Sequence, residues 1–514
     1  MKAIVTIICV LAIGLIAISF LHHEGGSVSG GDVKTLTVYC AAGIKNPVAA
    51  AAAAYEQETG VRVQLQFGGT GTLLSQIRVA NQGDLFVAAD EGAVADAKRH
   101  KTVREVIPLV LQYPVIAVKA GNPKKIASLA DLLREDVKTA IANPEAASIG
   151  KATRAAAGDR WPELKQRVAV MKPTVTELAA DLTIGAIDAA VIWNSTVPQF
   201  KGIEAVRIPE FDDRSDKVTV SVLSVAEDGP GALKFARYLA APEKGGEIFR
   251  GMGFEAIQGD RWAEAPELIL YSGGVNRPAV EELLKEFQAR EGITIHTMFN
   301  GCGILCAAMK AMTNAANPKY PDAYYACDLC FVPPVAEQFP EAVLITETDI
   351  GICVQKGNPL GIKTLADLAQ PKLRVGLCNA EQSTLGYMTK GMLTASALFE
   401  AIRKNVVVEV PTADFLVNQM RAGALDAAIV YRVNFQLQEE HLDYVAIDHE
   451  GAKAVQPFAV RGDSERKQLA GRLLEHMLAN RGRFEASGFT WKGDLPTLKS
   501  KDIVVPDWLK PEGK

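Results

Sequence analysis

The chain has 514 residues, of which 48% are hydrophobic and 22% charged, a composition typical of a soluble globular protein. Its formal net charge is −5, and the sequence contains no basic run with interleaved aromatic residues, so we expect no nucleic-acid binding. At about 150 residues per domain, the length is enough for three or four compact units.

The N-terminus reads as a targeting segment. Met1 and Lys2 precede an unbroken apolar stretch over residues 3–21, and polar, glycine-rich sequence follows to residue 32. The stretch approaches the roughly 20 residues that span a bilayer, and no small-x-small cleavage site follows it directly. We therefore interpret residues 1–32 as an inner-membrane anchor plus linker, slightly favoured over a cleaved signal peptide. Either interpretation places the body of the protein in the periplasm or elsewhere outside the cytoplasm.

Beyond the leader, the chain repeats itself. Gly-Ala-Ile-Asp-Ala-Ala at 185–190 returns as Gly-Ala-Leu-Asp-Ala-Ala at 423–428, and Phe-Gly-Gly-Thr-Gly at 67–71 returns as Phe-Asn-Gly-Cys-Gly at 299–303. A period this long indicates a duplicated domain rather than a solenoid repeat. We predict copy one over residues 33–258, a linker over 259–266, copy two over 267–492 and a polar tail over 493–514.

Within copy one, short β-branched runs alternate with longer helical patterns, which predicts an α/β fold with mostly parallel sheets. The predicted strands are Leu36–Tyr39, Val61–Phe67, Asp84–Val87, Val115–Val118, Thr139–Ile141 and Val168–Met171. Capping-box sequences predict helix starts at Ser128 and Thr174, and at Thr364 in copy two. Residues 313–326 are longer than their copy-one counterpart and are interpreted as a surface insertion.

Several strand-to-helix junctions in copy one expose backbone amides. Gly43 follows the first predicted strand, and Gly-Thr-Gly at 69–71 opens a helix after the second. N–H groups at a helix N-terminus attract an anion, and the side chains of Thr70, Ser148 and Trp193 supply further neutral donors. Such a site suits a fully ionised tetrahedral oxyanion, whereas the alternative is an ordinary set of glycine-rich turns. No Walker sequence, Gly-x-Ser-x-Gly elbow or metal-ligand histidine spacing occurs, so we predict no enzyme.

Five segments in order resemble the periplasmic molybdate/tungstate-binding proteins of ABC transporters. They are residues 36–43, 67–73, 84–90, 143–150 and 190–193. The resemblance covers nearly all of copy one and, more loosely, copy two. It implies two tandem periplasmic-binding-protein-like domains, each of two α/β lobes joined by crossover strands. It also implies a type II solute-binding protein that holds molybdate or tungstate, needs no cofactor and feeds an ABC permease.

The same resemblance implies the ligand contacts. In copy one they fall at Gly43, Thr70, Ile149, Val175 and Trp193. Internal alignment places their copy-two equivalents at Gly274, Cys302, Leu385, Ala413 and Tyr431. Gly43 stands where the family has its first serine, and Trp193 stands where the family has a tyrosine. In copy two a thiol, a weak donor, replaces a hydroxyl, so copy two binds something else or nothing.

The cysteines gather in copy two. Cys302 and Cys306 lie one helical turn apart, and Cys327 and Cys330 are spaced to supply two more sulfurs. In an exported protein we favour two disulfides, with buried free thiols or a zinc or soft-metal site as alternatives. Asp84 and Asp328 are placed at corresponding strand starts, where we expect them to orient local backbone.

Three other functions stay open from the residues alone. The apolar leader suits a membrane-anchored anion sensor or scaffold, and the cysteines suit a thiol- or metal-dependent function in copy two. A ferric-ion receptor is disfavoured because copy one lacks a tyrosine cluster.

Overall fold

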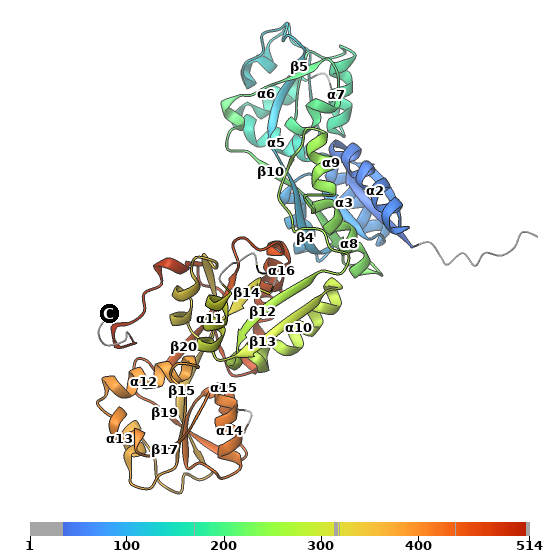
Figure 1. Cartoon of the computed structure of the whole chain (residues 1–514). Coiled ribbons are helices and arrows are strands. Elements are labelled where there is room, and N and C mark those ends of the chain that lie inside the picture. The colour runs from blue at the N-terminus through green and yellow to red at the C-terminus, as the bar shows by residue number, and fades with distance from the viewer. Residues whose placement is uncertain (1–33, 169, 313–316, 318, 437, 510–514) are drawn as a thin grey trace, which may run out of the picture.

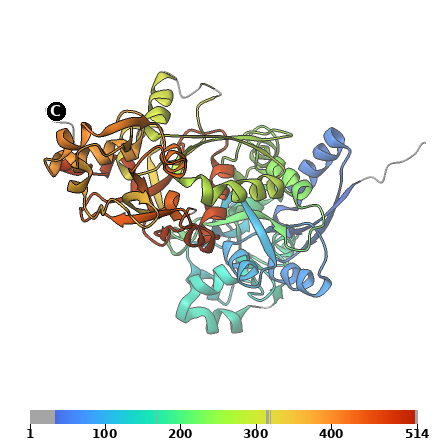
Figure 2. The ribbon, with the colours of Figure 1, turned by 90° about the horizontal axis from the view of Figure 1, so that it is seen from below.

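The computed structural model describes residues 34–168, 170–312, 317, 319–436 and 438–509. Both views place copy one, blue to green, and copy two, yellow-green to red, at opposite ends of the molecule (Figures 1 and 2). The predicted anchor over residues 3–21 lies outside the described residues. Within the described part, no helix has the length and apolar character that crossing a membrane requires.

The first lobe of copy one holds both ends of that copy. Its strands are β1 (Thr35–Ala41), β2 (Arg62–Gly68), β3 (Leu85–Ala88), β4 (Val103–Gln112), β10 (Asp216–Leu223) and β11 (Glu255–Ala256). Its helices are α2 (Lys45–Thr59), α3 (Thr70–Ala80), α4 (Glu91–Arg99), α8 (Gly229–Ala240) and α9 (Gly245–Gly251). The six strands lie in the order β11-β4-β10-β3-β1-β2, with β1 parallel to both β2 and β3.

The second lobe of copy one is a smaller sheet of order β7-β6-β8-β5-β9. Its strands are β5 (Pro114–Lys119), β6 (Thr139–Ala142), β7 (Met171–Lys172), β8 (Ala189–Trp193) and β9 (Ile203–Val206), and its helices are α5 (Ser148–Ala157), α6 (Trp161–Arg167) and α7 (Val175–Thr183). The chain crosses between the lobes at Tyr113 and again over residues 207–215. Tyr113 and Asn194 exchange two hydrogen bonds of 2.9 Å, which fix the first crossover.

Copy two repeats this plan with one continuous sheet. Its strands are β12 (Glu267–Gly273), β13 (Thr294–Asn300), β14 (Ala323–Tyr325), β15 (Glu341–Gln355), β16 (Val375–Cys378), β17 (Val406–Val410), β18 (Ala427–Tyr431), β19 (Leu442–Ala446), β20 (Lys453–Val460), β21 (Thr490–Trp491) and β22 (Leu498–Lys499). Its helices are α10 (Arg277–Glu291), α11 (Cys302–Ala311), α12 (Thr384–Ala395), α13 (Phe399–Arg403), α14 (Ala413–Arg421), α15 (Arg432–Gln436), α16 (Lys467–Leu478) and α17 (Arg481–Ala486).

The strand β15 explains why this sheet is continuous. It runs unbroken for 15 residues and pairs with β20 in the first lobe and with β18 in the second. In copy one the same path is interrupted at Tyr113, between β4 and β5. The buried side chains differ accordingly. They form separate clusters in the two lobes of copy one and a single cluster that spans both lobes of copy two.

The sequence located most of these elements. Five of the six predicted strands coincide with β1, β2, β3, β5 and β6, whereas the sixth overlaps β7 only at Met171. The capping boxes at Ser128 and Thr364 form as predicted, each opening a 3-10 turn. The hydroxyl of Thr174 accepts a hydrogen bond from the Glu177 amide at the start of α7, also as predicted.

A buried cluster of charged side chains joins the two copies. Glu291, at the end of α10, receives two 2.9 Å hydrogen bonds from Arg472 on α16. Arg237 on α8 of copy one donates to the Glu291 carbonyl at 2.9 Å and lies 3.4 Å from its carboxylate. Burial alone would raise the pKa of Glu291, but the facing guanidiniums outweigh it and hold that pKa below its ordinary value.

The linker and the tail are both packed segments. In the linker, the Asp260 carboxylate accepts the amides of Gln468 and Leu469 at 2.7 and 2.8 Å and so caps α16 of copy two. In the tail, β22 pairs with the first-lobe end of β15. Beyond it, Leu509 is buried and its carbonyl accepts a hydrogen bond from Tyr387 on α12, in the second lobe. The tail therefore joins the two lobes of copy two.

We expect Glu291→Ala to lower the free energy of unfolding by about 3–5 kcal/mol, because it leaves two buried guanidiniums without their partner. The control Glu286→Ala removes an exposed ion pair with Arg483 and should change the free energy of unfolding by less than about 1 kcal/mol. Because the folded pKa of Glu291 is lowered, its contribution is present above the unfolded-state pKa and is lost as pH falls through the folded value. Denaturant titrations at neutral and acid pH measure both effects, and equal losses for the two variants would contradict them.

Candidate functional site

The cleft of copy one contains a pocket where several helices begin. All five residues predicted as ligand contacts line it, together with Ser148 and Gln112. Thr70, Ser148 and Val175 are the first residues of α3, α5 and α7, and Gly43 lies in the 3-10 turn that leads into α2. The amides at a helix start have no acceptor within their own helix, so these N–H groups converge on one point from both lobes.

The polar side chains of the pocket are held in place from behind. The Thr70 hydroxyl oxygen accepts the Ala89 amide at 3.4 Å, which leaves its proton free to turn toward the pocket. The Trp193 indole donates to the Ser148 hydroxyl at 3.4 Å. Gln112 donates to the Ala89 carbonyl at 2.7 Å and accepts from Ser195 at 3.1 Å. The pocket therefore presents oriented hydroxyl and amide donors.

The pocket is small and carries no formal charge. None of its lining residues is Asp, Glu, Lys, Arg or His, and its volume is about 20 Å³. Each helix N-terminus contributes roughly half a unit of positive charge through the aligned peptide dipoles. The arrangement can thus hold a compact anion by dipoles and hydrogen bonds alone, and in this conformation it has no room for a sugar phosphate.

Gly69 and Gly71 let the lobes touch backbone to backbone. A Cβ atom on Gly69 would lie 2.3 Å from the Ala146 carbonyl oxygen, and one on Gly71 would lie 2.5 Å from that of Glu145. The Gly71 amide donates to the Ala146 carbonyl at 3.1 Å. We expected the amides of this turn to face an anion. The Gly71 amide instead holds the lobes together, and the glycines are required by the close approach.

The same contact recurs in copy two. A Cβ on Gly301 would lie 2.2 Å from the Gln382 carbonyl oxygen, and one on Gly303 would lie 2.0 Å from that of Glu381. Ile304 donates to the Gln382 carbonyl at 3.3 Å. Both copies are therefore closed at the same point.

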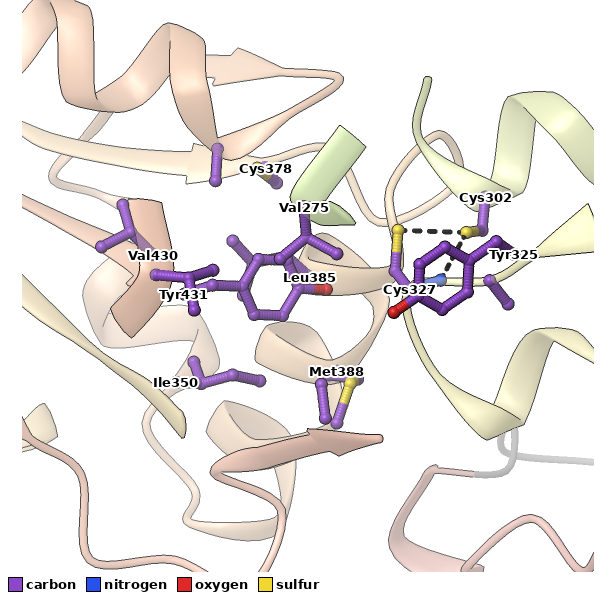
Figure 3. Close-up of a cluster of buried hydrophobic side chains, with 14 of the residues drawn as sticks. Val275, Cys302, Tyr325, Cys327, Ile350, Cys378, Leu385, Met388, Val430 and Tyr431 are labelled. Atoms are coloured by element: carbon purple, nitrogen blue, oxygen red, sulfur yellow. Dashed lines mark hydrogen bonds between the residues drawn. The ribbon is translucent and has the colours of Figure 1, made fainter. Parts of the chain in front are cut away.

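The copy-two equivalents of the pocket residues occupy the same structural positions. Gly274 begins a 3-10 turn, Cys302 and Ala413 begin α11 and α14, Leu385 is the second residue of α12, and Tyr431 ends β18. Cys302, Leu385, Ala413 and Tyr431 belong to one core cluster of buried side chains. Figure 3 shows Cys302, Leu385 and Tyr431 among their apolar neighbours. The Cys302 sulfur accepts the Cys327 amide at 3.1 Å, as Thr70 accepts that of Ala89 in copy one.

The structure brings two of the four cysteines together. Cys302 and Cys327 lie with their sulfurs 3.1 Å apart, whereas Cys306 turns toward the Tyr324 hydroxyl and the Phe331 carbonyl. The cysteines of the described residues are free thiols in this structure, and the two disulfides that we favoured stay a prediction. The part of the chain that the structure describes holds no group of three or more His, Cys, Asp or Glu placed for a metal, and hence no four-sulfur site with Cys330.

The alignment of Asp84 with Asp328 was wrong. The Asp84 carboxylate accepts the Thr37 amide at 2.8 Å, and it is Asp322 that accepts the matching Ile269 amide at 2.9 Å. Asp328 lies beyond β14, in the place of Asp90. The predicted surface insertion over 313–326 caused the error, because residues 323–325 form the buried strand β14 instead.

The model of the bacterial extracellular solute-binding protein family matches residues 36–255 and again residues 268–490. The chain belongs to this family. The two matched segments confirm the predicted tandem duplication and its α/β fold. As a family member the chain is an extracytoplasmic solute-binding protein of the kind that works with ABC transporters.

Several relatives bind molybdate. ModA of Escherichia coli, named a molybdate-binding protein, is 27% identical over 237 residues, which span 43% of this chain and 90% of ModA. A protein of Haemophilus influenzae described as a binding protein is 28% identical over 243 residues, 47% of this chain and 97% of its own length. The periplasmic molybdate-binding protein of Azotobacter vinelandii shares 16% identity, with a TM-score of 0.38 over 43% of this chain and 100% of that one.

We expect Gly69→Ala to hold the cleft of copy one open, because the new methyl group collides with two carbonyl oxygens of the opposite lobe. Loss of the Gly71–Ala146 hydrogen bond should speed hydrogen exchange of the Gly71 amide roughly 2- to 10-fold. This factor corresponds to the net free energy of one hydrogen bond, about 0.5–1.5 kcal/mol. Gly251→Ala is the control, since a Cβ there meets nothing within 4 Å. Unchanged exchange in Gly69→Ala would contradict the assigned contact.

Proposed function

We propose that copy one binds a tetrahedral oxyanion, molybdate or tungstate, and delivers it to an ABC permease. The observation that carries this proposal is the uncharged pocket where α3, α5 and α7 begin, which presents donors from both lobes. A fully ionised oxyanion only accepts hydrogen bonds, and neutral donors with oriented dipoles satisfy it without a Lys or Arg. The relatives named as molybdate-binding proteins support the same ligand.

Individual groups take distinct parts in this binding. Thr70 and Ser148 donate hydroxyl protons from opposite lobes, and the backbone amides of Gly43, Ile149 and Val175 supply the remaining donors. Trp193 positions the Ser148 hydroxyl through its indole N–H. No acid, base or nucleophile is involved, so the ligand leaves chemically unchanged and the protein needs no cofactor.

Binding would couple to closure of the lobes. The chain crosses between them at Tyr113 and over residues 207–215, and a rotation there opens the cleft without disturbing either sheet. The Gly71–Ala146 hydrogen bond then forms as the lobes meet around the anion. A permease would distinguish this closed form from the open one.

We further propose that residues 3–21 anchor the protein at the inner membrane, which N-terminal sequencing of the mature protein tests.

We expect Thr70→Val to weaken molybdate binding about 10- to 100-fold in calorimetric titrations of the purified protein, because one hydrogen bond to a charged ligand is worth about 1.5–3 kcal/mol. Thr183→Val is the matched control, since its hydroxyl bonds to the Ala179 carbonyl at the far end of α7.

Titrations with tungstate, sulfate and phosphate accompany this comparison. We expect heat from molybdate and tungstate and little from the two smaller anions, because fixed donors select by size. Absence of heat with both larger anions would contradict the proposed function.

A further inference from the structure

The cleft of copy two carries a pair of thiols where copy one carries an anion pocket. Cys302 stands in the place of Thr70, and Cys327 in the place of Ala89, which lines that pocket. The same contact shows that these positions correspond. The Ala89 amide donates to the Oγ1 of Thr70 in copy one, and the Cys327 amide donates to the Sγ of Cys302 in copy two. The two sulfur atoms lie 3.1 Å apart, joined by the dashed line in Figure 3.

The hydrogen bond between the two sulfurs makes Cys302 the more acidic thiol of the pair. Cys302 is the first residue of α11, where the helix dipole favours a negative sulfur. Burial raises the pKa of Cys302. Hydrogen bonds from the Cys327 thiol, from the hydroxyls of Thr384 and Tyr324, and from the Cys327 amide outweigh burial and hold that pKa below its ordinary value. The hydrogen bond between the two sulfurs, with burial, raises the pKa of Cys327.

The opposite lobe faces this pair with two hydroxyl groups, one of which has no partner. Tyr431 and Thr384 are both buried. The Tyr431 hydroxyl makes no hydrogen bond in the described structure, whereas the Thr384 hydroxyl lies against the sulfurs of Cys302 and Cys327. Figure 3 shows the Tyr431 hydroxyl pointing toward the sulfur pair. In copy one the equivalent side chains, Trp193 and Ser148, bond to one another instead. Because a buried unpaired hydroxyl costs about 1–3 kcal/mol, this arrangement favours a ligand that supplies oxygen.

The sulfur pair and the facing hydroxyl groups together indicate the chemistry of the ligand. A disulfide or a bare soft-metal ion would use the sulfurs and leave the Tyr431 hydroxyl unpaired. The ligand must therefore contain one atom that bonds to sulfur and that also carries oxygen. We propose that the cleft of copy two binds the oxyacid of a trivalent thiophilic element, such as arsenite, through Cys302 and Cys327.

The binding step is a condensation and needs no oxidant. Each thiol attacks arsenic and replaces one hydroxyl group, so two As–S bonds form and two As–O bonds break. The two thiol protons leave with those hydroxyls as two water molecules, and arsenic stays trivalent. The remaining As–OH group then faces the hydroxyls of Tyr431 and Thr384. Adjacent sulfurs on one lobe suit a pyramidal centre, which bonds both from the same side.

A cavity of copy two includes residues next to Cys327 in the sequence. Its volume is about 700 Å³, and its lining includes Met388 and Asp328, the residue after Cys327. The tail, residues 504 and 506–509, forms another wall of the cavity.

The test uses the full-length protein, reduced and freed of reductant without air, and then mixed with sodium arsenite. We expect one arsenic per chain by intact mass, a fall of two in the free-thiol count, and an arsenic X-ray absorption spectrum with two sulfur and one oxygen neighbours. Cys327→Ala, which restores the copy-one residue, should abolish the adduct. Cys306→Ser, one helical turn from Cys302, should bind as the wild type does.

A further variant tests the hydroxyl half of the site. Tyr431→Phe should keep the stoichiometry of one arsenic and weaken arsenite binding roughly 2- to 10-fold, as expected for one neutral hydrogen bond. The proposal is overturned if the reduced wild type takes up no arsenic, or if the isolated protein holds a Cys302–Cys327 disulfide that re-forms in glutathione buffer and excludes arsenite. Arsenic uptake that persists in Cys327→Ala would also overturn it.

Discussion

The close approach of two backbones across the cleft is the constraint on which the rest of the structure depends. Where α3 begins, Gly69 and Gly71 meet carbonyl oxygens of the opposite lobe at distances that no Cβ atom tolerates, and copy two repeats the contact at Gly301 and Gly303. This contact brings helix N-termini of both lobes to one point. The result is a small cavity lined by amides, which needs no charged side chain to attract an anion.

From this shared frame the copies diverge in rigidity and in chemistry. In copy one the strand path is interrupted at Tyr113, the lobes have separate cores, and the pocket is an uncharged one of hydroxyls and amides. Copy two has the unbroken strand β15, one core across both lobes and a tail that fastens the second lobe to the first. Hinge closure around a ligand suits the first arrangement. The second has exchanged a hydroxyl for a pair of thiols in a mostly apolar setting.

The sequence predicted the duplication, the α/β alternation and the residues that line the pocket, because each depends on local pattern or on order along the chain. It failed where a position depends on pairing between distant segments. Cys327 was grouped with Cys330 by spacing, but β14 places it beside Cys302, and the longer segment before β14 hid that register. The role of Gly71 was also missed, since the sequence does not reveal which carbonyl lies opposite.

The central claim is that copy one, and not copy two, holds the oxyanion between the starts of α3, α5 and α7. Crystals of the protein grown with molybdate and measured at the molybdenum absorption edge test it most directly. The account predicts one anomalous peak per chain, within hydrogen-bonding distance of Thr70 and Ser148. A peak in the cleft of copy two, or no ordered molybdenum in either cleft, would contradict it.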